Sequence, residues 1–196
     1  ITNLIHRENE LRVAVGSGWY CGKISRGRVG QLNTSLALIA RIDIKYADGT
    51  SDTFFSDENW EVEESKIRFA DIYDGEHYDA TFVPEGRAKV KVCDYSKDQL
   101  IHQQGESIVF MEKLTPVREI ITPKGERVLD FGQEITGIVS FTVDATKGDI
   151  IRLSCAEVLD KDGNFYTENY RDSKSEMIYT CRDGVQSWQP QLSFYG

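Results

Sequence analysis

Carboxyl groups are concentrated in residues 71–79, which contain four acidic side chains, two tyrosines and one histidine. Two carboxyl groups that face one substrate, drawn from Asp71, Asp74 and Glu76, could serve as general acid and general base in glycoside hydrolysis. Clustered oxygen ligands could instead bind calcium, although the spacing of these acids differs from that of an EF-hand loop. We favour a third interpretation, in which the segment forms a tightly hydrogen-bonded structural turn.

Two adjacent aromatic residues, Trp19 and Tyr20, lie in a glycine-rich segment between Gly16 and Gly22. An aromatic ring can stack on the apolar face of a sugar, so this pair is a candidate carbohydrate-binding site. The competing interpretation, which we favour, is that Trp19 buries about 200 Å² beneath the loop. A phosphate-binding loop is a poor explanation because the glycine spacing is GxGxxxG and no helical pattern follows. The glycines are expected to let the chain turn sharply.

Signals for metal ligands and nucleophiles are weak in the rest of the chain. Residues 160–164 resemble half a calcium loop, but the pair Asp162-Gly163 and the flanking β pattern favour a hairpin tip. The histidines and the widely separated cysteines show no ligand spacing, so we expect neither a zinc site nor a disulfide framework. We expect reduced, partly buried thiols and a cytoplasmic protein. These residues are His6, His77, His102, Cys21, Cys93, Cys155 and Cys181.

The elements that must position these groups are predicted to be short β-strands. Apolar and polar residues alternate in residues 11–15, 38–46, 139–143 and 151–153, and helical periodicity is nearly absent. The pairs Asp48-Gly49 and Asp162-Gly163 lie between such runs, which indicates tight hairpin turns, and a further Asp183-Gly184 pair follows residues 177–181. Strands at this spacing are typical of β-sandwiches or barrels.

Composition narrows the function classes. The 196 residues carry a formal net charge of −9, which disfavours binding to the phosphate backbone of nucleic acids. No apolar run approaches the length of about 18 residues that a membrane-spanning helix needs. The composition shifts between residues 83 and 105, where a polar stretch follows Pro84. We therefore predict two all-β units, residues 1–103 with the connector and residues 104–196.

Several segments, in order along the chain, resemble the accessory β-domains of bacterial α-L-rhamnosidases. Residues 15–22 are similar to the family pattern GxGWYxG, and residues 71–80 are similar to DIYDGExYDAR, with Thr81 in place of the arginine. Residues 128–133 resemble the start of the family pattern VLDFGQNxxGW. The chain differs from this pattern at Glu134, where the family usually has Asn, and at Ile138, where it often has Trp. Residues 156–169 follow AEVLDxDGxxYTxNxR, with Arg171 in register. Residues 44–50 and 56–60 extend the resemblance, which covers nearly the whole chain.

The resemblance implies an all-β chain of two consecutive antiparallel β-sandwich or jelly-roll units. The first would be the later part of a jelly roll, and the second would be truncated at its C-terminal end. In the family, terminal α-L-rhamnose is hydrolysed with inversion by acids of a separate (α/α)6 domain. We therefore expect a non-catalytic fragment without catalytic residues or a required cofactor, whose partners are that domain and rhamnose-containing glycosides. Residues 130–134 and 167–171 are expected to face the catalytic domain.

Two other functions stay open. The fragment could be a calcium-dependent rhamnose-binding module, active in isolation, with Trp19 and Tyr20 at the sugar site. The resemblance places some of the expected calcium ligands upstream of Ile1. Alternatively, the fragment could itself hydrolyse glycosides through Asp71, Asp74 or Glu76. An incomplete sandwich would also expose strand edges, so a homodimer is plausible. Neither a nucleic acid nor a membrane is expected as a partner.

Overall fold

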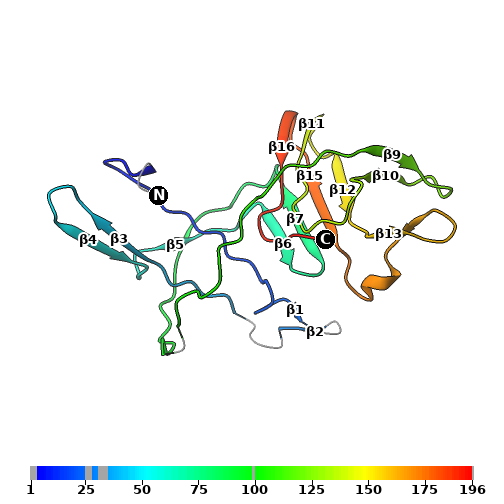
Figure 1. Ribbon diagram of the computed structural model, residues 1–196. Helices are drawn as coiled ribbons and strands as arrows, with labels where there is room; N and C mark the ends of the chain where they lie inside the picture. The colour runs from blue at the N-terminus through cyan, green and yellow to red at the C-terminus, as the bar shows by residue number, and fades with distance from the viewer. Residues whose placement is uncertain (1–3, 25–27, 31–34, 99, 196) are drawn as a thin grey trace.

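Strands from distant parts of the chain lie side by side in the computed structural model (Figure 1), which describes residues 4–24, 28–30, 35–98 and 100–195. The predicted all-β class is confirmed, and the short 3-10 helix η2 (Glu168–Tyr170) interrupts the β pattern near the C-terminal end. The strands are β1 (Lys23–Ile24), β2 (Arg28–Val29), β3 (Arg41–Lys45), β4 (Ser51–Phe55), β5 (Glu61–Val62), β6 (Ile67–Asp71), β7 (Gly75–Asp79), β8 (Ala88–Lys89), β9 (Arg118–Ile121), β10 (Arg127–Asp130), β11 (Phe141–Ala145), β12 (Ile150–Ser154), β13 (Val158–Leu159), β14 (Phe165–Tyr166), β15 (Glu176–Thr180) and β16 (Gly184–Trp188).

The central sheet has four strands in the order β12-β15-β7-β6. Strand β7 runs parallel to β15, and the other two pairings are antiparallel. In Figure 1 the cyan and green strands β6 and β7 therefore lie beside the yellow and orange strands β12 and β15. This sheet takes strands from both sides of the boundary that we placed at residues 103 and 104. The boundary itself stays a prediction.

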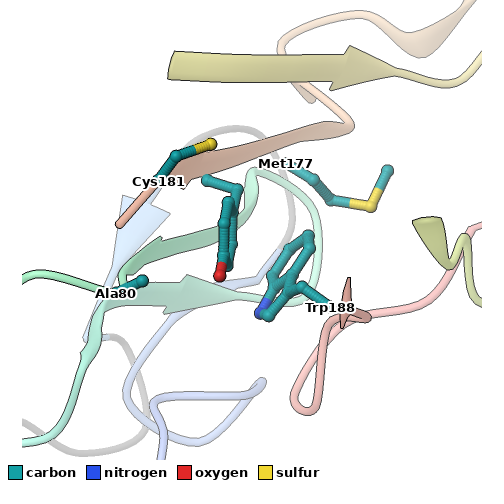
Figure 2. Close-up of a cluster of buried hydrophobic side chains, with 5 residues drawn as sticks. Ala80, Met177, Cys181 and Trp188 are labelled. Atoms are coloured by element: carbon teal, nitrogen blue, oxygen red, sulfur yellow. The ribbon is translucent and has the colours of Figure 1, made fainter. Parts of the chain in front are cut away.

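A second layer, the antiparallel pair β11–β16, covers one face of the central sheet. Phe141 lies opposite Trp188 in this pair, and both rings contact Tyr179 of β15, at centroid distances of 5.5 and 5.2 Å. Alternation along β11 and β15 directs every second side chain toward the space between the layers. The buried cluster gathers in one region, which Figure 2 shows, and consists of Ala80, Met177, Tyr179, Cys181 and Trp188.

Two predicted hairpins are confirmed. Asp48-Gly49 connects β3 to β4, and Asp162-Gly163 connects β13 to β14. The φ angles are +88° at Gly49 and +83° at Gly163, a region that glycine enters without a steric penalty. Asp183 lies at a bend directly before β16, which begins at Gly184, but β15 and β16 pair with different neighbours instead of forming a hairpin.

The strand predicted for residues 11–15 is wrong. These residues form no strand, and the side chains of Leu11, Val13 and Val15 are each more than 40% exposed. A strand needs a partner that accepts and donates ladder hydrogen bonds, and within the described ranges this run has none. The alternation of apolar residues is typical of a strand, but it does not show whether a second strand is available for pairing.

Candidate functional site

The predicted turn at the start of the acidic segment is confirmed, and Asp71 organises it. The carboxylate is 4% exposed, and its Oδ1 atom accepts hydrogen bonds from the backbone N–H groups of Tyr73 and Asp74, at 2.9 and 3.0 Å. The Oδ2 atom accepts the backbone N–H of Lys23 at 2.5 Å. Asp71 thus holds its own turn and fixes the end of the glycine-rich segment at the same time.

Lys23 extends this network to the C-terminal half of the chain. Its Nζ atom, nearly buried, donates to Asp74 Oδ1 at 3.0 Å and to the carbonyl oxygen of Asp172 at 2.5 Å. Burial alone would lower the pKa of Lys23, but the hydrogen bond and charge of Asp74, helped by Asp172 and Asp71, raise that pKa above its ordinary value. The lysine is therefore a charged link between three segments.

The same turn is also bound through its backbone. The carbonyl oxygen of Tyr73 accepts hydrogen bonds from the N–H of Ser175 at 3.1 Å and from the hydroxyl of Ser173. The N–H of Glu176 donates to the carbonyl oxygen of Asp74 at 3.2 Å. These bonds lead directly into the parallel pairing of β7 with β15, so the turn serves as a joint between two parts of the chain.

Glu76, the third acid considered for catalysis, lies in the interior. It is 0% exposed, and its Oε2 atom accepts the backbone N–H groups of Gln191 and Leu192 at 2.9 and 2.7 Å. Burial raises the pKa of Glu76 above its ordinary value, although the two N–H groups act in the opposite direction. Reasoning from the sequence did not predict that Glu76 is buried. The signal that could have found it is the alternation of β7, which puts Glu76 on the same face as Tyr78.

The three acids therefore do not face one substrate. The carboxyl groups of Asp71 and Asp74 are engaged with backbone N–H groups and Lys23, and that of Glu76 is enclosed in the interior. Two hollows, of about 230 and 460 Å³, occur elsewhere. The first lies along β6, between Gly16 and Phe69, and the second lies at the β13–β14 hairpin, beside Tyr166. Neither contains a carboxyl group of this turn.

Trp19 and Tyr20 lie on a turn at the surface, with 56% and 53% of their surface exposed. The burial that we favoured for Trp19 is therefore wrong. The N–H of Cys21 closes the turn on the carbonyl oxygen of Ser17 at 2.9 Å. A side chain at Gly22 would meet Asp71 Oδ2 and the backbone of the turn, which explains the glycine. The structure thus presents two aromatic rings on a turn held by Asp71, and their role in sugar binding stays a prediction.

Asp160 forms the predicted hairpin tip. Its Oδ1 atom accepts the N–H groups of Asp162 and Asn164, at 2.9 and 2.8 Å, as in an Asx turn. In the part of the chain that the structure describes, no three or more His, Cys, Asp or Glu side chains are grouped so as to hold a metal ion.

The four cysteines are unpaired, and they range from buried Cys181 to exposed Cys93. Burial raises the pKa of Cys155 to about 11, so its thiol is protonated at neutral pH. Across the described ranges, no helix is long and apolar enough to cross a membrane. The cytoplasmic location expected from the cysteines stays a prediction.

Comparisons with known proteins agree along the whole chain. Residues 1–120 match the model of the alpha-L-rhamnosidase N-terminal domain, and residues 120–196 match that of the bacterial alpha-L-rhamnosidase concanavalin-like domain. An alpha-L-rhamnosidase of Streptomyces avermitilis is 33% identical over 200 residues, which cover 96% of this chain and 19% of the relative.

Solved structures of α-L-rhamnosidases share the fold of this chain. The crystal structure of Streptomyces avermitilis alpha-L-rhamnosidase complexed with L-rhamnose aligns with a TM-score of 0.79 and 32% identity, over 91% of this chain and 19% of that chain. The alpha-L-rhamnosidase of Aspergillus terreus aligns with a TM-score of 0.84 and 27% identity, over 92% of this chain and 22% of that chain. The chain spans about a fifth of the length of the relatives that it matches. Because both family domains match in order along its length, this chain belongs to the α-L-rhamnosidase family.

Proposed function

We propose that this chain is a non-catalytic β-sandwich region of a bacterial α-L-rhamnosidase. In this role it supports the hydrolysis of terminal α-L-rhamnose by a separate (α/α)6 catalytic domain. The observation that carries the proposal is that the carboxyl groups of Asp71, Asp74 and Glu76 are occupied by contacts within the chain. Inverting hydrolysis requires one carboxyl group to protonate the leaving oxygen and another to activate water across the sugar. Asp71 and Asp74 instead bind backbone groups and Lys23, and Glu76 lies inside the core.

The large exposed surface supports a scaffold that packs against other protein. The chain exposes 15560 Å², whereas a folded monomer of 22.3 kDa is expected to expose about 9,400 Å². Large apolar side chains contribute to this surface: Ile108 is 99% exposed and Met111 87%, and Phe54 and Phe55 are exposed on the two-stranded β3–β4 hairpin. Such patches mark contact surfaces when they exceed a few hundred Å². We propose that residues 130–134 and 167–171 also face the catalytic domain.

An aryl α-L-rhamnoside assay tests the catalytic part of the proposal. The purified chain, with its fold checked by the near-ultraviolet circular dichroism of its buried aromatic residues, should release no aryl alcohol above the buffer rate. The Asp71→Asn and Glu76→Gln variants should give the same background rate as the unaltered chain. Turnover by the chain that these substitutions abolish would overturn the proposal and identify it as a glycosidase.

A rhamnose-binding module is a second candidate function, favoured by the exposure of Trp19 and Tyr20 on a turn that Asp71 holds. Isothermal titration with L-rhamnose, with and without calcium, separates the two functions. Saturable binding that Trp19→Ala removes and Tyr95→Ala retains would support the module, because Tyr95 is similarly exposed (58%) in a different segment. No heat of binding in either condition would leave the scaffold as the function. A homodimer through uncovered strand edges would appear as a doubled mass in light scattering.

A further inference from the structure

The carboxyl group of Glu76 lies on the core face of the central sheet. In the sheet register Glu76 is opposite Met177 of β15 and Ala70 of β6, and Tyr78 follows it on the same face. Met177 is 1% exposed and belongs to the buried hydrophobic cluster. An acidic side chain at this position is surrounded by apolar groups, where an ionised carboxylate is costly unless a cation or several donors compensate it.

The two oxygen atoms of Glu76 have unequal surroundings. Oε2 accepts the N–H groups of Gln191 and Leu192, whereas Oε1 is buried and has no hydrogen-bond partner among the described residues. The bonded segment is itself well anchored, because Pro190 is fully buried and Tyr195 exchanges two backbone hydrogen bonds with Gly137. Glu76 thus fastens residues 190–195, which belong to the concanavalin-like domain, to a strand of the N-terminal domain.

The groups around Glu76 offer no positive charge. None of the ion pairs in the described ranges includes Glu76, and Lys23, which contacts the β6–β7 turn, is paired with Asp74. The strands beside β7 carry two cations, but Arg68 of β6 lies over the ring of Phe82 and Arg152 of β12 is paired with Glu176. The other titratable groups packed around Glu76 are neutral or negative, so they add nothing that would favour the ionised form. They are Tyr78 on β7, Tyr179 on β15, Cys155 after β12, Tyr195 on the C-terminal segment, and Asp71 and Asp74 at the β6–β7 turn.

We propose that Glu76 is held as a neutral carboxylic acid, with its proton on Oε1, and acts as a latch between the two family domains that loosens when the proton is lost to solvent. Oε2 remains free to accept the two N–H groups in the neutral form. An unpaired hydroxyl in the core costs far less than an unpaired charge, which selects the neutral form. The raised pKa of Glu76 agrees with this assignment. The latch concerns the stability of this chain and stands apart from its accessory role.

The sign of the pH effect follows from linkage. Below the ordinary pKa of a glutamate carboxyl group, 4.5, Glu76 is neutral in both the folded and the unfolded chain. As the pH rises, the unfolded chain ionises first, so the folding equilibrium constant falls until the folded carboxyl ionises too. Each pKa unit between the two states lowers that constant about tenfold. Glu76→Gln removes this loss, because glutamine stays neutral and its amide oxygen can accept the two N–H groups.

The test compares the pH dependence of unfolding in the unaltered chain, Glu76→Gln and the exposed control Glu58→Gln. The stability of the unaltered chain and of Glu58→Gln should fall relative to Glu76→Gln as the pH rises above about 4.5. The protection of the Gln191 and Leu192 amides against hydrogen exchange should fall over the same range in the unaltered chain and in Glu58→Gln, and should stay constant in Glu76→Gln. Parallel profiles for all three proteins would overturn the proposal.

A second measurement covers the case in which Glu76→Gln fails to fold. Carbon-13 NMR of glutamate carboxyl groups in the unaltered chain should show one resonance that titrates at higher pH than the others. If every glutamate titrates in the ordinary range, Glu76 is ionised in the folded chain and the proposal is wrong.

Discussion

Tyr78 and Tyr179 stack face to face, with ring centroids 5.5 Å apart and ring planes inclined by only 6°. They are direct neighbours in the parallel pairing of β7 with β15. Tyr78 lies in the segment matched by the N-terminal domain of the family, and Tyr179 in the segment matched by the concanavalin-like domain. The two family domains therefore share one sheet and one hydrophobic core in this chain.

A double-mutant cycle should detect the coupling between these two rings. Tyr179→Ala should lower the free energy of unfolding by about 3 kcal/mol, since it empties a buried aromatic position. The interaction energy between Tyr78→Ala and Tyr179→Ala should be about 1 kcal/mol, measured by urea unfolding. Tyr95→Ala, at an exposed position, should change stability by less than about 0.5 kcal/mol. Strictly additive losses would show that the stacking contributes nothing.

Gly75→Ala should be among the most damaging single changes. The φ angle of Gly75 is +112°, and an added Cβ would lie 1.8 Å from the carbonyl oxygen of Glu176. Backbone strain and the displaced β7–β15 pairing should together cost about 3 kcal/mol. Gly105→Ala is the matched control, because an added Cβ meets nothing within 4 Å there. Equal midpoints of thermal unfolding for the two variants would refute the close approach at Gly75.

Asp71→Asn should loosen the surface turn that carries Trp19 and Tyr20. An amide group can replace only one of the two carboxylate oxygens, so either the Lys23 N–H or the pair of turn N–H groups loses its acceptor. A buried donor left without a partner costs about 1–3 kcal/mol. Limited proteolysis should then cut near Trp19 and Tyr20 at a higher rate, whereas Asp94→Asn, at an exposed position, should leave the cutting pattern unchanged. No change in the rate would mean that Asp71 does not hold the turn.

Cutting the connector should leave the two parts of the chain together. A protease recognition sequence can be inserted between Gly105 and Glu106, because both residues are exposed, lie outside the strands, and an added Cβ at Gly105 meets nothing within 4 Å. After cleavage, the fragments should elute as one complex in native buffer and separate in urea, because β7 is bonded to both β6 and β15. Separation in native buffer would show that the shared sheet is too weak to join them and would favour independent units.

Local features of the fold could be predicted from the sequence because they depend on neighbouring residues. The Asp-Gly pairs at Gly49 and Gly163 define hairpins over a few residues, and the turn begun by Asp71 closes on its own backbone. The ordered motifs likewise identified the family. The prediction for residues 11–15 failed because alternation marks the faces of a strand but not the presence of a partner.

The sequence by itself determined the all-β class, the tight turns and the membership of the rhamnosidase family, since short-range patterns carry each of these. Only the tertiary structure decided that β7 pairs with β15, that Glu76 lies in the core, and that Trp19 is exposed. Those three facts depend on which distant segments meet. The sequence near Glu76 does not show whether its carboxyl group faces water or Met177, because the residues that surround it come from the other end of the chain.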